Sequence, residues 1–176
     1  MSKDIRKLVY CALCIALATV MSQIRLFSMP MGGSITPASM LFAALPGFFF
    51  GPFYGISSAV AYGLLHFILK PEIYSPAQVA VDYLFAFGAL GFSGFFSKKK
   101  HALLLGYSAA ALGRFVFAFL SGYLFFGSYA PEGVAPILYS AEYNISYIGT
   151  EFILTLLLLA VPAVQKAIYQ VKESAG

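Results

Sequence analysis

The sequence predicts an all-α integral membrane protein that crosses the bilayer with six helices. Three observations carry this prediction: 60% of the 176 residues are hydrophobic, only 10% are charged, and the mean hydropathy is +0.83. Soluble domains are about half apolar and about a quarter charged, and one of this size could not bury so much apolar surface. A bilayer accepts that surface, so cytosolic enzymes, disordered tails and nucleic-acid modules are disfavoured.

Apolar runs divide residues 1–176, which we interpret as a single membrane domain, into six segments. A transmembrane helix needs about 20 apolar residues, or fewer where it is broken or tilted. The polar stretch 28–39 follows the first run, Lys70-Pro71 ends the third, and the lysines at 98–100 end the fourth. We expect Pro46-Gly47 to interrupt the second helix. The expected helices cover residues 5–23, 40–50, 54–69, 77–96, 103–126 and 143–164.

The basic residues predict the orientation of these helices. Most of the 11 Lys and Arg residues flank apolar runs at ends that would share one side of the membrane. They are Lys3, Arg6, Lys7, Lys98, Lys99, Lys100, Lys166 and Lys172. Because positively charged loops stay on the cytoplasmic side, we expect both termini inside the cell. The same placement favours contact with lipid and disfavours a nucleic-acid partner.

Motifs for catalysis are missing from this sequence. Cys11 and Cys14 form a C-x-x-C inside an apolar helical run, where packing is expected rather than a redox or metal site. There is no H-E-x-x-H, no G-x-S-x-G and no P-loop. We therefore expect no enzyme activity, no resident cofactor or metal, and no means for the chain to power transport by itself.

Three ionisable residues lie inside apolar helices, where a charge is costly and indicates function. Asp82 lies near the outer end of the fourth expected helix, Arg114 midway along the fifth, and Glu151 within the sixth. Arg114 could bond a carboxylate in a structural network, or the charges could meet a ligand. For Asp82, which Tyr83 follows, we favour contact with a cationic or hydrogen-bonding ligand.

A polar and aromatic stretch leads into the last expected helix. Tyr139 and Tyr143 are four residues apart and share a face if the segment is helical. Asn144 offers both a donor and an acceptor. These residues form either an interfacial aromatic belt with Asn144 as a helix cap, or a binding wall, which the neighbouring Phe126 favours.

Small residues at four-residue spacing let helix backbones approach each other in lipid. Gly55, Ala59 and Gly63 predict such a seam within the bundle. Ala12 and Ala16 predict a similar contact, either inside the bundle or as a docking face for another membrane protein.

Four segments in order carry a family resemblance. They are Ser28-Met29-Pro30-x-Gly32-Gly33-Ser34, Asp82-Tyr83-x-x-Ala86-Phe87, Ser121-Gly122-x-x-Phe125-Phe126-Gly127-Ser128-x-Ala130-Pro131-x-Gly133, and Tyr139-Ser140-x-x-Tyr143-Asn144. Together they resemble the thiamine-specific substrate-binding (S) components of energy-coupling factor (ECF) vitamin transporters, the ThiT/YuaJ family. The resemblance implies a six-helix S-component fold in a bacterial cell membrane, with a vitamin pocket that faces outward. It also implies that release inward requires a membrane scaffold subunit, EcfT, and two cytosolic ATPases.

The resemblance assigns roles to particular residues. Asp82 is implied as the pocket carboxylate beside Tyr83, and Phe126 as the stacking aromatic. The full set implied at the substrate site is Asp82, Tyr83, Arg114, Ala118, Phe126, Tyr139, Tyr143 and Asn144. Ala12 and Ala16 are implied to dock the scaffold. The first outer loop, with Gly32, Gly33 and Ser34, is expected to act as a lid, because paired glycines tolerate the dihedral changes of opening.

Ala118 departs from the family pattern, which commonly has a histidine there. Loss of an imidazole removes a stacking and hydrogen-bonding surface worth about 1–2 kcal/mol. The ligand is therefore either thiamine held differently, which we favour, or another heteroaromatic compound such as pyridoxine-type vitamin B6 or the hydroxymethylpyrimidine precursor. A stand-alone secondary carrier is the alternative class.

Overall fold

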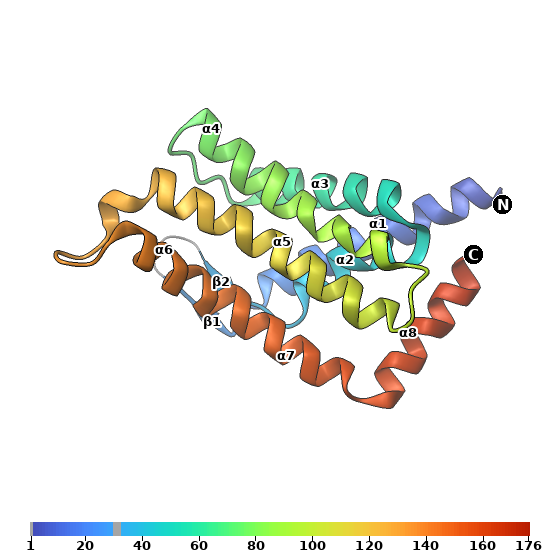
Figure 1. Ribbon diagram of the computed structural model, residues 1–176. Helices are drawn as coiled ribbons and strands as arrows, with labels where there is room; N and C mark the ends of the chain where they lie inside the picture. Colours follow the sequence, from blue (N-terminus) through green and yellow to red (C-terminus); the bar gives the residue numbers. More distant parts are fainter. Residues whose placement is uncertain (1, 30–32) are drawn as a thin grey trace.

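The structure, a computed structural model, describes residues 2–29 and 33–176 as an elongated helical bundle (Figure 1). Its elements are α1 (Lys3–Gln23), β1 (Phe27–Ser28), β2 (Ser34–Ile35), α2 (Ser39–Phe50), α3 (Pro52–Leu69), α4 (Pro76–Val79), η2 (Ala80–Ala86), η3 (Ala89–Phe96), α5 (Ala102–Phe125), η4 (Gly127–Tyr129), α6 (Pro136–Asn144), η5 (Ile145–Gly149), α7 (Thr150–Leu159) and α8 (Pro162–Ala175). The helices run along the long axis of the bundle, and α8 turns back across one end.

The exterior of the bundle is apolar, as a lipid-facing surface requires. Large hydrophobic side chains such as Leu13, Leu112 and Leu157 are exposed along the helices. Within the described residues, four helices are long and apolar enough to cross a membrane, and the bent pair 136–159 and 162–175 gives a fifth candidate. The 12-residue α2 spans about 18 Å, less than the hydrocarbon core of about 30 Å. The count of six crossings and the inward orientation of the termini therefore stay predictions.

Helix α2 lies in the centre of the bundle, in contact with α1, α3, η3 and α5. The expected interruption at Pro46-Gly47 is wrong, since α2 runs without a break from Ser39 to Phe50. A proline removes one helical hydrogen bond, but Pro46 is almost fully buried. The Ser93 hydroxyl also donates to the Ala44 carbonyl at 2.6 Å. Packing on several sides thus outweighs the local cost of the proline.

The predicted small-residue seam is found inside the bundle. A Cβ atom at Gly55 would lie 2.6 Å from the Gly47 Cα and 2.7 Å from the Gly91 carbonyl oxygen. Such close approach of α2, α3 and η3 is possible only because these positions carry no side chain. Cys11 and Cys14 are buried and free on the inner face of α1, where they pack against other side chains.

The last predicted helix, 143–164, differs most from the structure. A continuous helix (α6, η5 and α7) runs from Pro136 to Leu159, and a second helix, α8, follows at an angle of 88°. Both α6 and α8 begin with a proline near their N-termini, where the missing N–H costs nothing. Val161 is extended, with φ −75° and ψ 116°, and separates the two. The apolar run alone did not indicate this turn.

Helix α8 is fastened to the rest of the bundle. The Tyr169 ring contacts the Phe48 ring edge-on, with centroids 5.3 Å apart. The Lys172 ammonium donates to the Ser97 carbonyl at 2.8 Å and lies 3.9 Å from the centre of the Phe48 ring. The end of the bundle that holds both termini is therefore covered by a packed helix.

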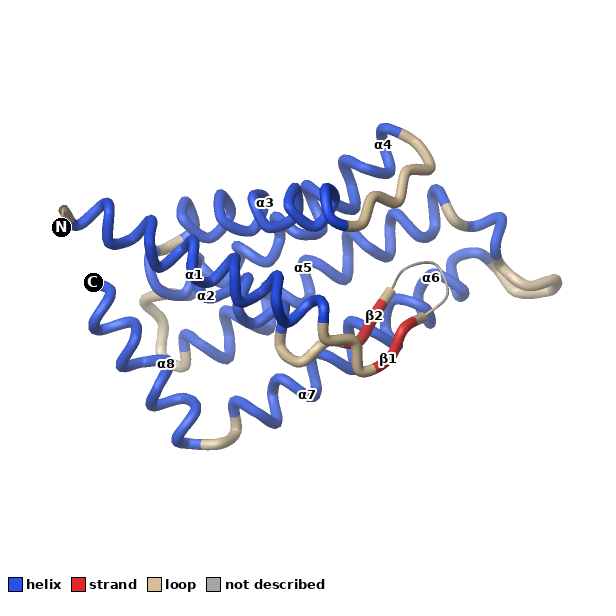
Figure 2. The backbone as a smooth tube through the Cα atoms, turned by 180° about the vertical axis from the view of Figure 1, so that it is seen from behind, coloured by secondary structure: helices blue, strands red, loops and turns tan. Residues whose placement is uncertain are grey.

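The two ends of the bundle differ. The N- and C-termini lie at one end, and a small antiparallel hairpin lies toward the other, beside α6 (Figure 2). The hairpin pairs Phe27 with Ile35 and Ser28 with Ser34, so the first loop contains two short strands that an all-α prediction omits.

Candidate functional site

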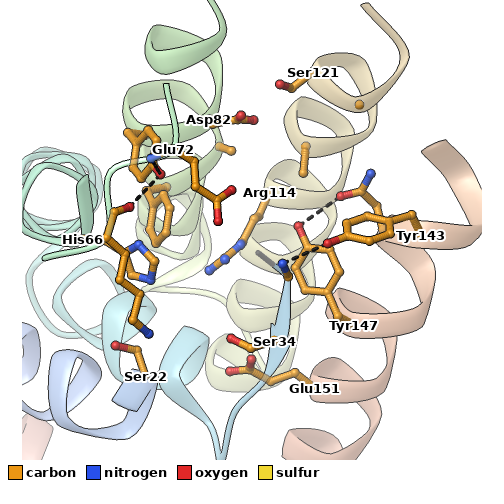
Figure 3. Close-up of a pocket in the computed structure, with 18 of the residues that line it drawn as sticks. Ser22, Ser34, His66, Glu72, Asp82, Arg114, Ser121, Tyr143, Tyr147 and Glu151 are labelled. Carbon is orange, nitrogen blue, oxygen red and sulfur yellow. Dashed lines mark hydrogen bonds between the residues drawn. The ribbon is translucent and has the colours of Figure 1, made fainter. Parts of the chain in front are cut away.

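A cavity of ≈ 150 Å³ opens at the hairpin end, between α3, η2, α5 and the helix formed by α6, η5 and α7 (Figure 3). All eight residues predicted for the substrate site line it: Asp82, Tyr83, Arg114, Ala118, Phe126, Tyr139, Tyr143 and Asn144. Gly33 and Ser34 of the predicted lid also line the cavity, whereas Gly32 lies outside the described residues. Five separate segments therefore meet in one place. Their roles in binding stay predictions.

Two π-helical segments border the cavity. The segment η2 carries Asp82 and Tyr83, and η5 directly follows Asn144 and carries Tyr147. Single π-turns are rare and are found frequently at functional sites, because they change the direction in which side chains point. This geometry is an indication of function that is independent of the sequence motifs.

Asp82 is half-buried on η2 and faces Ser121 of α5 across the upper part of the pocket in Figure 3. Its Oδ2 accepts a hydrogen bond of 2.6 Å from the side-chain amide of Gln78, one helical turn earlier. The Ser121 hydroxyl lies close enough to stabilise the carboxylate, but it does not form a short hydrogen bond with it among the described residues. Asp82 thus keeps an acceptor for a ligand donor.

Arg114 does not form the structural ion pair that we considered. Within residues 2–29 and 33–176 the recorded ion pair is Lys7 with Asp4, at 3.9 Å. The Arg114 guanidinium instead lies over the Phe87 ring, 4.4 Å from its centre. This cation–π contact stabilises the charge, and the Arg114 side chain lines the cavity.

Glu151 is buried, with 4% of its surface exposed, and it is held by the first loop and α2. It accepts hydrogen bonds from the Thr36 hydroxyl at 2.7 Å, the Ser39 hydroxyl at 3.0 Å and the Met40 N–H at 2.9 Å. The alternative of an Arg114–Glu151 network is therefore wrong. The carboxylate instead caps the N-terminus of α2, where a negative charge is favourable.

The aromatic wall comes from one helix. The Tyr139, Tyr143 and Tyr147 rings follow each other, with neighbouring centroids 6.3 and 5.6 Å apart. Asn144 is buried inside this continuous helix, so its alternative role as a helix cap is wrong. Its amide donates to the Ser140 carbonyl at 2.9 Å, and its oxygen accepts from the Tyr147 hydroxyl at 3.0 Å. These bonds fix the amide at the cavity wall.

The first loop closes against this wall. The Gly33 N–H donates to the Tyr143 hydroxyl at 2.9 Å, and a Cβ at Gly33 would lie only 2.7 Å from the same oxygen. At the mouth, the Phe126 ring contacts Tyr74 and Tyr129, with centroids 5.6 and 6.1 Å away. The first loop and Phe126 thus both line the cavity, each fixed by its own contacts.

Sequence reasoning missed several lining residues. His66 faces the cavity from α3, and its Nδ1 is buried without a hydrogen-bond partner in the described part of the chain. Ser121 has a similarly unpartnered hydroxyl. Lys70 and Glu72 enter from the loop between α3 and α4. The position of Glu72 just before a helix that carries Asp82 was the one signal in the sequence.

Comparisons with known proteins agree on one family. The sequence model of the thiamine transporter protein family (Thia_YuaJ) matches residues 8–170. The thiamine transporter ThiT of Bacillus subtilis (strain 168) is 30% identical over 178 residues, which cover 90% of each chain. The chain belongs to the thiamine transporter family.

The structure of this chain also resembles a solved structure from the thiamine transporter family. A solved structure of ThiT from Listeria monocytogenes superposes with a TM-score of 0.74 and 25% identity, over 92% of this chain and 97% of that one. The resemblance identified from four sequence segments is thus confirmed at the level of family and fold. Together with its long apolar helices, membership of this family makes the chain a multi-pass membrane protein.

Proposed function

We propose that this protein is the substrate-binding S component of an ECF transporter and that its ligand is thiamine. The single observation that carries the proposal is the cavity, in which all eight predicted site residues meet. The family of the chain, and the name of its Bacillus subtilis relative, support thiamine as the ligand.

The cavity offers the contacts that a flat, cationic, heteroaromatic ligand needs. Phe126 and the row of tyrosines supply apolar faces for ring stacking, which is worth about 0.5–1.5 kcal/mol per pair beyond the buried area. Asp82, Arg114 and Asn144 supply a few fixed polar groups that would orient the ligand. We infer that stacking supplies most of the affinity and that the polar groups supply specificity.

The proposal includes partners for the transport step. No P-loop occurs in the sequence, so ATP-driven uptake would need a nucleotide-binding partner. We infer that EcfT and two cytosolic ATPases fill this role, as the family resemblance implies, and that Ala12 and Ala16 belong to the scaffold contact. Both alanines are exposed on α1, on the face opposite the buried Cys11 and Cys14.

Calorimetric titration of the purified, detergent-solubilised protein tests the ligand. We expect one-to-one binding of thiamine and much weaker binding of pyridoxine. Asp82→Asn should weaken thiamine binding at least about tenfold, because charge-assisted hydrogen bonds contribute about 1.5–3 kcal/mol. Asp4→Asn, at an exposed site on α1, is the control and should bind as the wild type does.

Three results would count against the proposal. Tighter binding of pyridoxine than of thiamine would mean that the family fold is kept for a different vitamin. Equal affinity of wild type and Asp82→Asn would remove Asp82 from the site. Uptake of thiamine by vesicles that lack any ATPase partner would favour a stand-alone carrier.

A further inference from the structure

Glu72 adds a second carboxylate to the ligand-facing part of the cavity. It lies in the loop between α3 and α4 and is exposed at the mouth. In Figure 3 its side chain extends into the pocket from the same side as Asp82, toward Arg114. No ion pair of Glu72 is recorded with any residue in 2–29 or 33–176. The carboxylate is therefore not committed to a protein cation.

The loop that carries Glu72 is fixed by two buried side chains. The Tyr83 hydroxyl donates to the Lys70 carbonyl at 2.9 Å and accepts from the Glu72 N–H at 3.0 Å. The Gln78 side chain accepts from the Tyr74 N–H at 2.9 Å and donates to Asp82 at 2.6 Å. Tyr83 and Gln78 thus fix the backbone of the loop that carries Glu72, and Gln78 also holds the Asp82 carboxylate. A site fixed before binding loses less entropy when the ligand arrives.

The charges that line the cavity favour a cation. Three carboxylates (Glu72, Asp82 and Glu151) face two basic side chains (Lys70 and Arg114), which leaves a formal charge of −1 with His66 neutral. Glu151 already accepts three hydrogen bonds from the first loop and α2. The carboxylates that a ligand can meet are therefore Glu72 and Asp82. A monocation would neutralise the cavity, whereas a neutral ring would leave its charge uncompensated.

We propose that Glu72 is a specificity-determining residue, which together with Asp82 favours a permanently cationic ring over a neutral ring of the same shape. The inference rests on the proposed function, since the thiazolium ring of thiamine carries such a charge. Electrostatic complementarity discriminates between ligands of equal shape. Its effect grows when the ligand and the closed loop exclude water from the carboxylates.

A comparison of two ligands and three proteins tests this role. The ligands are thiamine and an isostere in which a neutral thiophene ring replaces the thiazolium ring. The proteins are the wild type, Glu72→Gln, which keeps the shape of the side chain but removes its charge, and Glu132→Gln. Glu132 is exposed in the loop between α5 and α6 and does not line the cavity, so it controls for loss of a surface charge at the same end.

We expect Glu72→Gln to weaken thiamine binding about 5- to 20-fold, as for a partly exposed charge pair that becomes desolvated. Binding of the neutral isostere should change less than about twofold, and Glu132→Gln should match the wild type for both ligands.

Equal losses for thiamine and isostere would assign Glu72 a structural role and overturn the inference, as would unchanged thiamine affinity. If the wild type binds neither ligand, the proposed function itself fails. If it binds both and Glu72→Gln alters neither, only the role of Glu72 is lost.

Discussion

Arg114 is a cation held in the cavity by an aromatic ring rather than by a carboxylate. Its guanidinium lies 4.4 Å from the centre of the Phe87 ring, and such contacts contribute about 0.5–2 kcal/mol. An ion pair with Asp82 or Glu72 would neutralise the groups that we assign to a cationic ligand. The stack on Phe87 therefore keeps the cation and the carboxylates of the cavity available for separate ligand groups.

Glu72 predicts a pH dependence of ligand selection. Partial burial and the nearby Asp82 raise the pKa of Glu72 above its usual value of 4.5, while Arg25 and Lys70 act in the opposite direction. A bound cation stabilises the ionised carboxylate and lowers the pKa of Glu72 again. Affinity for thiamine relative to the neutral isostere should therefore rise with pH through the raised pKa and fall as the pH is lowered. Calorimetry between about pH 4 and pH 7 measures this ratio of affinities. Thiamine and the isostere share the same aminopyrimidine ring, so protonation of that ring affects both affinities and cancels in the ratio.

The free energy of unfolding of the ligand-free protein should depend on pH with the opposite sign, so that it falls as the pH rises. A carboxyl group whose pKa is raised by folding favours the folded state at low pH, and this contribution is lost as the pH rises through the raised pKa. Glu72→Gln should remove the part of the affinity slope and of the stability slope that Glu72 contributes, and Asp82→Asn should leave that part in place. A ratio of affinities that is independent of pH in the wild type would contradict the assignment.

The sequence predicted those site residues that belong to short motifs or lie inside apolar helices. Asp82 and Arg114 stood out because a charge in such a helix is unusual, and Tyr139 and Tyr143 because their spacing matched a helical face. Tyr74 gave no such signal, and Glu72 gave only its position before the helix that carries Asp82, since charged and aromatic residues in a short loop are ordinary. Their place at the cavity depends on the bonds to Tyr83 and Gln78, which link positions that only the fold brings together.

At the scale of elements, Glu151 ties the first loop and α2 to α7. Helix α2 has no side-chain cap of its own, and Ala38 before it is left-handed with φ 63°. Glu151→Gln should lower the free energy of unfolding by about 1–3 kcal/mol, because an amide replaces a charge and one acceptor becomes a donor. Thermal unfolding in detergent measures the loss.

Glu142→Gln is the matched control for this change. Glu142 is exposed on α6, in the helix that continues into α7, so its replacement should leave the unfolding temperature close to that of the wild type. If Glu151→Gln were as stable as this control, the three hydrogen bonds would not be what holds α2 and the loop in place.

The ends of helices were predicted well where a proline or a cluster of charged residues follows the apolar run. Pro71 after Lys70 ends α3, and the lysines at 98–100 follow η3. The last helix was not marked in this way. Pro136 was read as part of a loop although it begins α6, and Pro162 lies within an apolar run although it begins α8. Hydropathy indicates which segments are apolar, but it does not indicate where one helix ends and the next begins in a different direction.

At the scale of the molecule, the two ends of the bundle carry different chemistry. Both termini lie at one end, opposite the first-loop hairpin near the cavity. The lysines at 98–100 follow Ser97, whose carbonyl accepts a hydrogen bond from Lys172 of α8 at the end with the termini. If this basic end faces the cytoplasm, as the positive-inside rule predicts, the cavity faces outward. A ligand captured there could reach the cytoplasm only after a rearrangement that this chain has no nucleotide site to drive.

The exposed face of α1 provides the place where such a rearrangement could be coupled to a partner. Ala12 and Ala16 are exposed one helical turn apart, and small residues in that pattern let a second helix approach closely in lipid. Replacement of both by leucine should abolish uptake in cells that contain the ECF partners, since the added volume would separate the helices. Thiamine affinity of the purified variant should stay within about twofold of the wild type, because neither residue lines the cavity. Ala61→Leu adds the volume of one such replacement to an exposed site on α3 and should leave uptake unchanged. Uptake that persists in the double variant would place the scaffold contact on another face of the bundle. Loss of thiamine binding would instead show that α1 supports the cavity rather than a partner alone.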